Sequence, residues 1–485
     1  MRGSITLLVL IFGGIFLAVL AALSSYVLSQ NNLQDVTRVQ AEAFNIAEAG
    51  LEYYRWHLAH FPNDLANGGS SDSFDVTIPD PSGGTAGTAH LSVSANMACG
   101  QTTSIDLTST GTASDDPAYP VTLEARYARP SVAAYSYIVN DSVWAGPDRV
   151  INGPYHSNGG VRMDGTANAE VTSSVSSWYC DSSFGCSPGQ NEPGVFGSGS
   201  NQDLWKYPTP QVDFAGIAAN FSSLKTTAQA SGIYLPQYST QGTYECSGWG
   251  WWQYCTYVGG NPHGGYHLIF NADGTVTVKE VTAETPLSEY PINPSDPTTD
   301  YALIQSETSG TTYTIPSNCG LIFVEDNAWI EGTIPSKVTV VVANTTSNGS
   351  VVPDAFIKGN IAYTSDNGSA GLTLISEHDI LITPDAPANL TLDGIFVAQS
   401  GAFGQNLYAC PGPYEPKGTL TIHGSTISYK RTGTQWENGC YSSGGYSNGG
   451  YLSRIDSFDQ PLSENPPPFT PALSTAFKFV NWQQL

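Results

Sequence analysis

Two histidines near the middle of the chain have a spacing that can bind metal when both lie on one helix face. His263 and His267 are four residues apart, and such an imidazole pair can hold zinc. However, Pro262 and the glycines between the histidines favour a turn, and no His-Glu-x-x-His pattern surrounds them. We therefore expect a surface turn here, and the metal content of the protein stays unknown.

Side chains that could transfer protons occur in three places far apart in the sequence. They are Asp148 with Arg149, the run Glu377–Asp379, and Asp393 with His423. Acid–base catalysis needs two such groups within reach of one substrate, and spacing along the chain does not establish that they converge. No catalytic residue is therefore predicted, and no motif indicates a cofactor.

Eight cysteines lie beyond the N-terminal region, an even number that suits disulfides in an oxidising compartment. Three candidate pairs are Cys180 with Cys186, Cys246 with Cys255, and Cys410 with Cys440. Zinc is the competing interpretation, but no Cys-x-x-Cys pair or Cys/His quartet with ligand spacing is present. We favour disulfides, and the pairing beyond the short loops stays open.

Aromatic residues gather around the second of these cysteine pairs. Trp249, Trp251, Trp252 and Tyr254 all lie between Cys246 and Cys255. If they are exposed, their flat rings could stack on a sugar or anchor a protein ligand. If they are buried, they form the small core of an inserted loop. They are candidate ligand-binding residues, with both readings open.

The extreme N-terminus carries an uncharged apolar run from Ile5 to Leu28 after the three residues Met1-Arg2-Gly3. Its 24 residues would form a helix about 36 Å long, enough to span a bilayer. A secretory signal peptide would have a shorter apolar stretch and a small-residue cleavage site. We expect a single membrane span with the N-terminus inside, an orientation that rests on Arg2 alone.

A helical pattern continues beyond the apolar run until Pro62. Apolar residues recur mostly at three- and four-residue steps, which places them on one face. They are Leu33, Val36, Ala43, Ala47, Leu51, Tyr54 and Leu58. One helix over residues 4–61 is therefore predicted, and its two halves need different packing partners.

Arg2-Gly3 before the apolar run, together with Ala43–Glu52 late in the helix, resembles the N-terminus of the PilX-like minor pilins of the type IV pilin-like class. The resemblance implies cleavage between Gly3 and Ser4 after a leader of residues 1–3. It also implies packing against other pilin-like subunits. Leu8 stands where a major pilin would carry glutamate, which favours a minor subunit. The alternative is an unprocessed signal anchor.

The composition is that of a large, acidic, turn-rich protein. There are 42 acidic and 17 basic side chains, a net charge of −25, 50 glycines and 31 prolines. Such a charge repels phosphate backbones, so nucleic-acid binding is excluded. The same acidity would tolerate calcium, but no motif supports a calcium site. We expect the domain after the helix to lie outside the cytoplasm.

Beyond the helix, short β-branched runs between turn residues predict an α+β protein whose exterior part is almost entirely β. Residues 70–130 predict a small antiparallel β domain, like a pilin headgroup, packed on the amphipathic half of the helix. Residues 131–485 predict a second β domain with an aromatic, disulfide-rich insertion at about 178–300.

A repeated pattern, an apolar residue two positions before a glycine, occurs four times in the second β domain. Its glycines are 27, 35 and 30 residues apart: Gly332, Gly359, Gly394 and Gly424. These intervals suit the coils of a right-handed β-solenoid with loops of varying length. A β-sandwich with glycine-bearing turns is the alternative.

Two hypotheses of different kinds follow. The first is a non-enzymatic minor subunit of a bacterial type IV pilus or pseudopilus, which helps assembly or displays an adhesion module for a surface glycan or protein. The second is a membrane-anchored β-helix enzyme that acts on polysaccharide. The first explains the amphipathic continuation of the helix, and the second does not.

Overall fold

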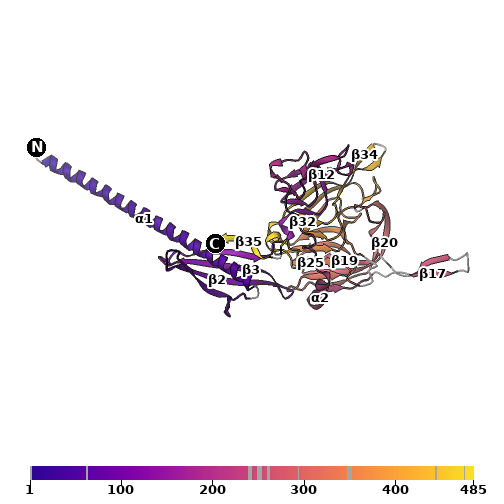
Figure 1. Cartoon of the computed structure of the whole chain (residues 1–485), viewed down its shortest axis with the longest axis horizontal. Helices are drawn as coiled ribbons and strands as arrows, with labels where there is room; N and C mark the ends of the chain where they lie inside the picture. The colour runs from indigo at the N-terminus through magenta and orange to yellow at the C-terminus, as the bar shows by residue number, and fades with distance from the viewer. Residues whose placement is uncertain are drawn as a thin grey trace. The chain divides into compact units, whose positions relative to one another are not determined.

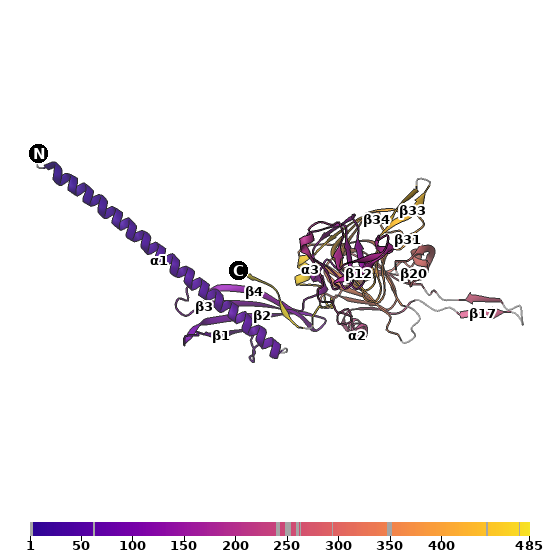
Figure 2. The same cartoon turned by 45° about the horizontal axis from the view of Figure 1, so that its top comes forward.

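The protein divides into two compact units, which Figures 1 and 2 show in two views. Unit 1 comprises residues 1–96, 104–128 and 477–485, and unit 2 comprises residues 97–103 and 129–476. The computed structural model describes residues 3–61, 64–238, 243–247, 254–258, 261, 263–292, 294–346, 352–442, 445–474 and 476–485. Two short segments therefore lie on the other side of the expected boundary near residue 130: residues 97–103 belong to unit 2, and residues 477–485 belong to unit 1.

One continuous helix, α1 (Gly3–His60), forms the N-terminal part of unit 1. The prediction of a long apolar helix at the N-terminus is therefore confirmed. No proline interrupts its 58 residues, and Pro62, which lacks the N–H that a helix requires, follows shortly after its end. The first half of α1 extends beyond the sheet of its own unit (Figure 1).

The sheet of unit 1 has five strands in the order β1-β2-β3-β4-β35. Their bounds are β1 (Ser73–Pro79), β2 (Thr85–Ala98), β3 (Gln101–Ala113), β4 (Val121–Ala128) and β35 (Lys478–Gln484). The pairs β1–β2, β3–β4 and β4–β35 are antiparallel. The last strand comes from the C-terminus, which the sequence analysis had assigned to the second β domain.

The second half of α1 packs on this sheet through small residues. A Cβ atom on Gly111 of β3 would lie 2.0 Å from the carbonyl oxygen of Ala43, so only glycine fits there. Ser109 donates a hydrogen bond to the carbonyl oxygen of Ala47 across 2.8 Å. The shared core comprises Ala43, Ala47, Leu51, Tyr54 and Leu58 from the helix and Leu91, Leu107 and Leu123 from the sheet. Close approach therefore fixes this half of the helix on its sheet.

Unit 2 is built mainly from ladders of parallel strands. The first ladder runs in the order β16 (Ile233–Leu235), β23 (Leu321–Val324), β25 (Lys337–Val342), β27 (Gly371–Ser376), β29 (Leu390–Ala398), β32 (Lys417–Ser428), β5 (Tyr137–Val139), β8 (Tyr155–Ser157), β11 (Val171–Ser173) and β15 (Trp205–Lys206). The early strands β5, β8 and β11 thus follow the late strand β32 in space.

A second ladder comprises β19 (Gly265–Phe270), β24 (Asn327–Ile334), β26 (Ala355–Tyr363), β28 (Ile380–Ile382) and β30 (Phe403–Gly404). A third ladder continues from β26 through the first parts of β29 and β32 to β34 (Gly445–Ser457), β7 (Arg149–Asn152) and β10 (Thr166–Ala167). Two of the repeated glycines, Gly394 and Gly424, stand opposite each other in this register.

Strands buried on both faces explain the nearly continuous apolar runs of these ladders. Val340 of the first ladder and Ile330 of the second belong to one core between the ladders. The opposite face of the first ladder, including Val341, is covered by other segments of unit 2. These include α2 (Phe221–Ser231), which buries Leu224, and α3 (Gln460–Glu464), which buries Leu462.

Antiparallel strands extend from the ladders. An arm formed by β20 (Thr275–Tyr290), β21 (Thr299–Glu307) and β22 (Thr311–Thr314) joins β19 and also pairs with β31 (Leu407–Tyr408). Hairpins are formed by β12 (Ser177–Cys180) with β13 (Gln190–Pro193), β17 (Thr243–Ser247) with β18 (Tyr254–Val258), and β33 (Gln435–Ser442) with β34. The strands β6 (Val143–Ala145), β9 (Val161–Met163) and β14 (Val195–Phe196) form a short parallel sheet.

Disulfides join Cys180 with Cys186, Cys410 with Cys440, and Cys99 with Cys319. The sequence analysis did not suggest the third pair, whose members are 220 residues apart. Cys246 of β17 stands opposite Cys255 of β18 in the hairpin register.

Candidate functional site

The first half of α1 presents an apolar surface that no other part of the described chain covers. Ile5 is 69% exposed, Phe12 63% and Leu20 43%. By length and composition, α1 is able to cross a membrane. Because each exposed aliphatic or aromatic side chain gains about 1.5–3 kcal/mol when it leaves water, this surface needs a lipid or protein partner.

The second half of α1 differs because it packs on the sheet of unit 1. Arg38, at its start, forms ion pairs with Glu42 and with Asp115. Exposed charges of this kind belong in water, so they mark where the membrane-compatible part of the helix has ended. Val39 and Ala43, which follow directly, are buried. The first half of α1 is therefore uncovered, whereas one face of its second half is already buried against the sheet of unit 1.

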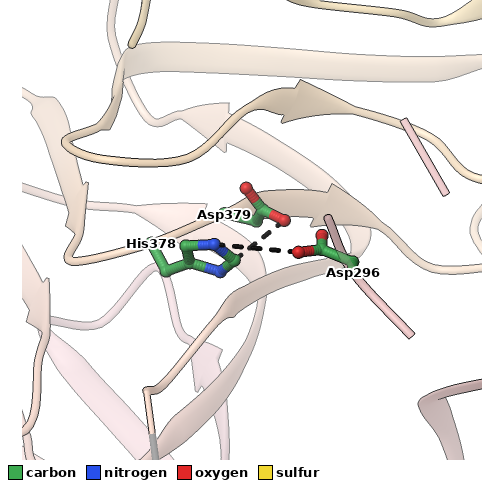
Figure 3. Close-up of side chains that lie close together, drawn as sticks. All are labelled: Asp296, His378 and Asp379. Carbon is green, nitrogen blue, oxygen red and sulfur yellow. Dashed lines mark ion pairs between the residues drawn. The ribbon is translucent and has the colours of Figure 1, made fainter. Parts of the chain in front are cut away.

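Three titratable side chains lie close together in unit 2, one from the loop between β20 and β21 and two from the residues just before β28 (Figure 3). Asp296, His378 and Asp379 offer ligand atoms that all lie within 4.8 Å of one another. His378 Nε2 is 3.9 Å from Asp296 Oδ1, and His378 Nδ1 is 3.7 Å from Asp379 Oδ2. We call these three residues the acidic cluster.

Separate elements position the acidic cluster. Asp296 lies between β20 and β21, whereas His378 and Asp379 directly precede β28. Asp354, just before β26, accepts hydrogen bonds on Oδ1 from His378 Nδ1 and from the backbone N–H of Asp379, both across 2.9 Å. The backbone N–H of Ala402 donates to Asp379 Oδ1 across 2.5 Å. The neighbouring rungs therefore hold both the imidazole and the buried carboxylate in place.

Burial and neighbouring charges shift the pKa values of His378 and Asp379 in the acidic cluster. Burial alone would lower the pKa of His378, but the surrounding carboxylates, Asp354 first among them, raise it above its usual value. Burial and the same carboxylates raise the pKa of Asp379 well above the usual range. Within the described residues, the ion pairs of Asp354 and Asp379 are both with His378.

A second group of buried acids lies next to the acidic cluster. Tyr408 donates a hydrogen bond to Asp300 Oδ2 across 2.6 Å, and Asn406 donates to the same oxygen across 3.2 Å. Burial, followed by the charge of Asp300, raises the pKa of Glu289 to about 10. This shift favours the neutral form of Glu289, which limits the negative charge in this region.

The structure brings together only part of what the sequence analysis singled out. His378 and Asp379 meet Asp296 and Asp354, which carried no sequence signal. Asp393 and His423 approach to 4.0 Å.

Arg149 forms an ion pair with Asp456, which is distant in the sequence. Burial raises the pKa of the neighbouring Asp148, and the charge of Arg149 partly opposes that rise.

The expected surface turn is wrong for His267, which is only 3% exposed and belongs to β19. Its ring nitrogens lie 2.7 Å from Glu307 and 3.1 Å from Glu331. The extended backbone is favoured because β19 pairs with strands on both sides. His263 stacks on Tyr301, with ring centroids 3.5 Å apart.

Several expected sites lie outside the described residues. Trp249, Trp251 and Trp252 are among them, and the side chain of Tyr254 is also not described. The same holds for the Ser4 side chain at the expected processing site. Their roles stay predictions.

One motif escaped the sequence analysis. Residues 445–449 have the spacing Gly-x-Ser-x-Gly, with Ser447 at the centre. Nucleophilic serines of this motif sit at a sharp turn from strand to helix. Ser447 instead lies inside β34, opposite Cys440 in an antiparallel hairpin. The motif therefore lacks the backbone that would activate it.

Neither a family model nor a curated protein matches the chain. Among solved structures, the competence-associated pilin ComZ from Thermus thermophilus is similar at 12% identity and a TM-score of 0.30. The similarity covers 92% of this chain and 97% of that chain. A TM-score this low carries no argument about fold or function.

Proposed function

We propose that the chain is a non-enzymatic minor subunit of a type IV pilus or pseudopilus. In this proposal α1 anchors the subunit in the membrane before assembly, with the N-terminus inside, and packs against other subunits afterwards. The observation that carries it is the division of α1 into an uncovered apolar half and a half fixed on its own sheet.

The length of α1 supports assembly beyond simple anchoring. About 20 apolar residues suffice to span a bilayer, whereas α1 has 58 residues. The additional turns do not end in a flexible linker but pack tightly on β3 through Gly111 and Ala43. Because the second half of α1 is held rigidly on its domain, packing of the first half between other subunits would fix the position of that domain in a filament.

The resemblance of the N-terminus to PilX-like minor pilins supports the same proposal. Within its quoted segment, Ala43 and Ala47 are buried against the sheet, while Glu48 is exposed. The small residues of the motif therefore have a packing role inside the subunit.

We further infer that the parallel ladders of unit 2 form a β-solenoid displayed outside the cell for assembly or adhesion. Parallel pairing along all three ladders supports a solenoid, because β-sandwiches are built from antiparallel sheets. The aromatic hairpin region around Cys246 and Cys255 is the candidate adhesive element.

Processing of the leader gives the first test. In membranes of the organism that carries the chain, intact mass and N-terminal peptide spectra should show a chain that begins at Ser4. A Gly3→Leu variant should retain Met1, because the resemblance places the cut directly after Gly3. A wild-type chain that keeps Met1 in membranes that process other pilins would contradict the proposal.

A further inference from the structure

We propose that Asp296, His378 and Asp379 bind a divalent transition-metal ion such as Zn²⁺ or Mn²⁺. The three ligand atoms come from two segments of unit 2 and lie within 4.8 Å of one another. Zinc bonds to nitrogen and oxygen are about 2.0–2.2 Å long, so two ligands of one ion are at most about 4.4 Å apart. A small inward movement of the side chains completes the site. This inference does not depend on the pilus proposal.

The first support is the buried carboxylate of Asp379. Its side chain is 0% exposed, and Oδ2 makes no hydrogen bond of ordinary geometry among the described residues, while Asp296 and His378 both lie beside it. The other oxygen, Oδ1, is held by the backbone N–H of Ala402, which fixes the direction of Oδ2. A buried, unsatisfied carboxylate oxygen is costly. A cation between Asp379 and Asp296 would satisfy it.

The second support is the orientation of His378. When Nδ1 carries the proton and donates to Asp354 Oδ1 across 2.9 Å, the lone pair of Nε2 faces Asp296 Oδ1. A carboxylate that accepts from the second ring nitrogen is the usual outer partner of a metal-binding histidine. Asp354 also accepts from the backbone N–H of Asp379. It therefore orients two of the three ligands and is a positioning residue.

The donor set decides the class of ion. One imidazole and two carboxylates suit zinc and manganese. Calcium takes six to eight oxygen ligands, and Asp354 Oδ1 is already engaged by two N–H groups. Two carboxylates with a neutral imidazole would balance the charge of one divalent ion. The ion would join the antiparallel arm, through Asp296, to the rung that begins at β28.

Isothermal titration tests this site on the full-length chain in detergent micelles after dialysis against EDTA. ZnCl₂ and MnCl₂ should each bind at one ion per chain, and CaCl₂ should bind at least tenfold more weakly. Asp379→Asn and His378→Gln should weaken Zn²⁺ binding at least tenfold. Asp354→Asn should weaken it by about tenfold or more, as loss of an outer partner does.

His423→Gln is the matched control, because His423 also lies beside two carboxylates, Asp393 and Asp459, but outside the acidic cluster. It should bind Zn²⁺ as the wild type does. Cobalt absorption provides a second readout, since Co²⁺ in the site should give visible bands that the Asp379→Asn variant lacks. Absence of one-to-one binding in the wild type, unchanged binding in both ligand variants, or tighter binding of Ca²⁺ than of Zn²⁺ would overturn the proposal.

Discussion

Replacing Asp456 by alanine is expected to lower the free energy of unfolding of unit 2 by about 3–5 kcal/mol, the usual cost of leaving buried charge unpaired. Asp456 is 1% exposed and accepts hydrogen bonds from two buried guanidinium groups. Arg149 Nη2 lies 2.5 Å from Oδ2, and Arg454 Nε lies 2.9 Å from Oδ1. Without the carboxylate, both buried cations lose the acid that they contact directly.

The position of Asp456 increases this effect. It lies on β34, which pairs with β7 more than 300 residues earlier, and Arg149 belongs to β7. The ion pair therefore joins early and late parts of the chain at one rung. The guanidinium of Arg149 also lies over the ring of Tyr137, 5.1 Å from its centroid.

The contribution of Asp456 should depend on pH in a defined direction. Burial alone would raise the pKa of Asp456, but Arg149 and Arg454 hold it below its usual value. Its stabilising effect is therefore complete above the unfolded-state pKa of about 3.9 and declines as the pH falls through the lower folded-state value. The difference between wild type and variant should shrink only in strong acid.

Urea unfolding of the full-length chain in micelles, followed by tryptophan fluorescence, measures this difference at pH 7 and in acid. Glu170→Ala is the control, because Glu170 pairs with Lys206 at the surface, where both side chains are about half exposed. That control should change the free energy of unfolding by about 1 kcal/mol or less. An equally small effect of Asp456→Ala would show that the buried pair does not stabilise unit 2.

Trp329→Ala should also cost about 3–5 kcal/mol, because it removes the largest fully buried side chain among the described residues. Trp329 stacks on Phe356 with ring centroids 4.8 Å apart. Its indole N–H donates to the carbonyl oxygen of Ala302 across 2.6 Å. It therefore joins β24 and β26 to the antiparallel arm, and Leu381, two residues after Asp379, belongs to the same small core.

The same urea titration tests this prediction. Trp329→Phe should lose clearly less than Trp329→Ala, because a ring still fills part of the space. Tyr313→Ala, on β22 with its side chain 39% exposed, should have little effect. If Trp329→Ala lost no more than Tyr313→Ala, the arm would not depend on this core.

The sequence was sufficient for features set by local periodicity. The spacing of apolar residues predicted the second half of α1, because a helix that buries one face needs an apolar residue every three to four positions. The glycine pattern was also informative: Gly394 and Gly424 stand in register and have φ values of 158° and 139°. A side chain on Gly424 would meet the backbone of Gly394.

Features set by long-range pairing could not be predicted. No local pattern shows that β35 joins the sheet of unit 1 or that β5 stacks on β32. Asp296 lies in a loop rich in proline between β20 and β21, and only the fold brings it to His378, 82 positions later. The turn expected at His267 failed for the same reason, since strand neighbours from distant segments fixed its backbone.

The most direct test of the central claim is photo-crosslinking from the uncovered half of α1. The photoreactive residue p-benzoylphenylalanine would replace Phe12 in the organism that carries the chain, with Tyr119 as the control position, which is exposed at 36% in a loop of unit 1. The account predicts an adduct between position 12 and another pilin-like subunit in the filament fraction, and none with that subunit from position 119. Adducts from position 12 with lipid alone, while filaments form normally, would contradict it.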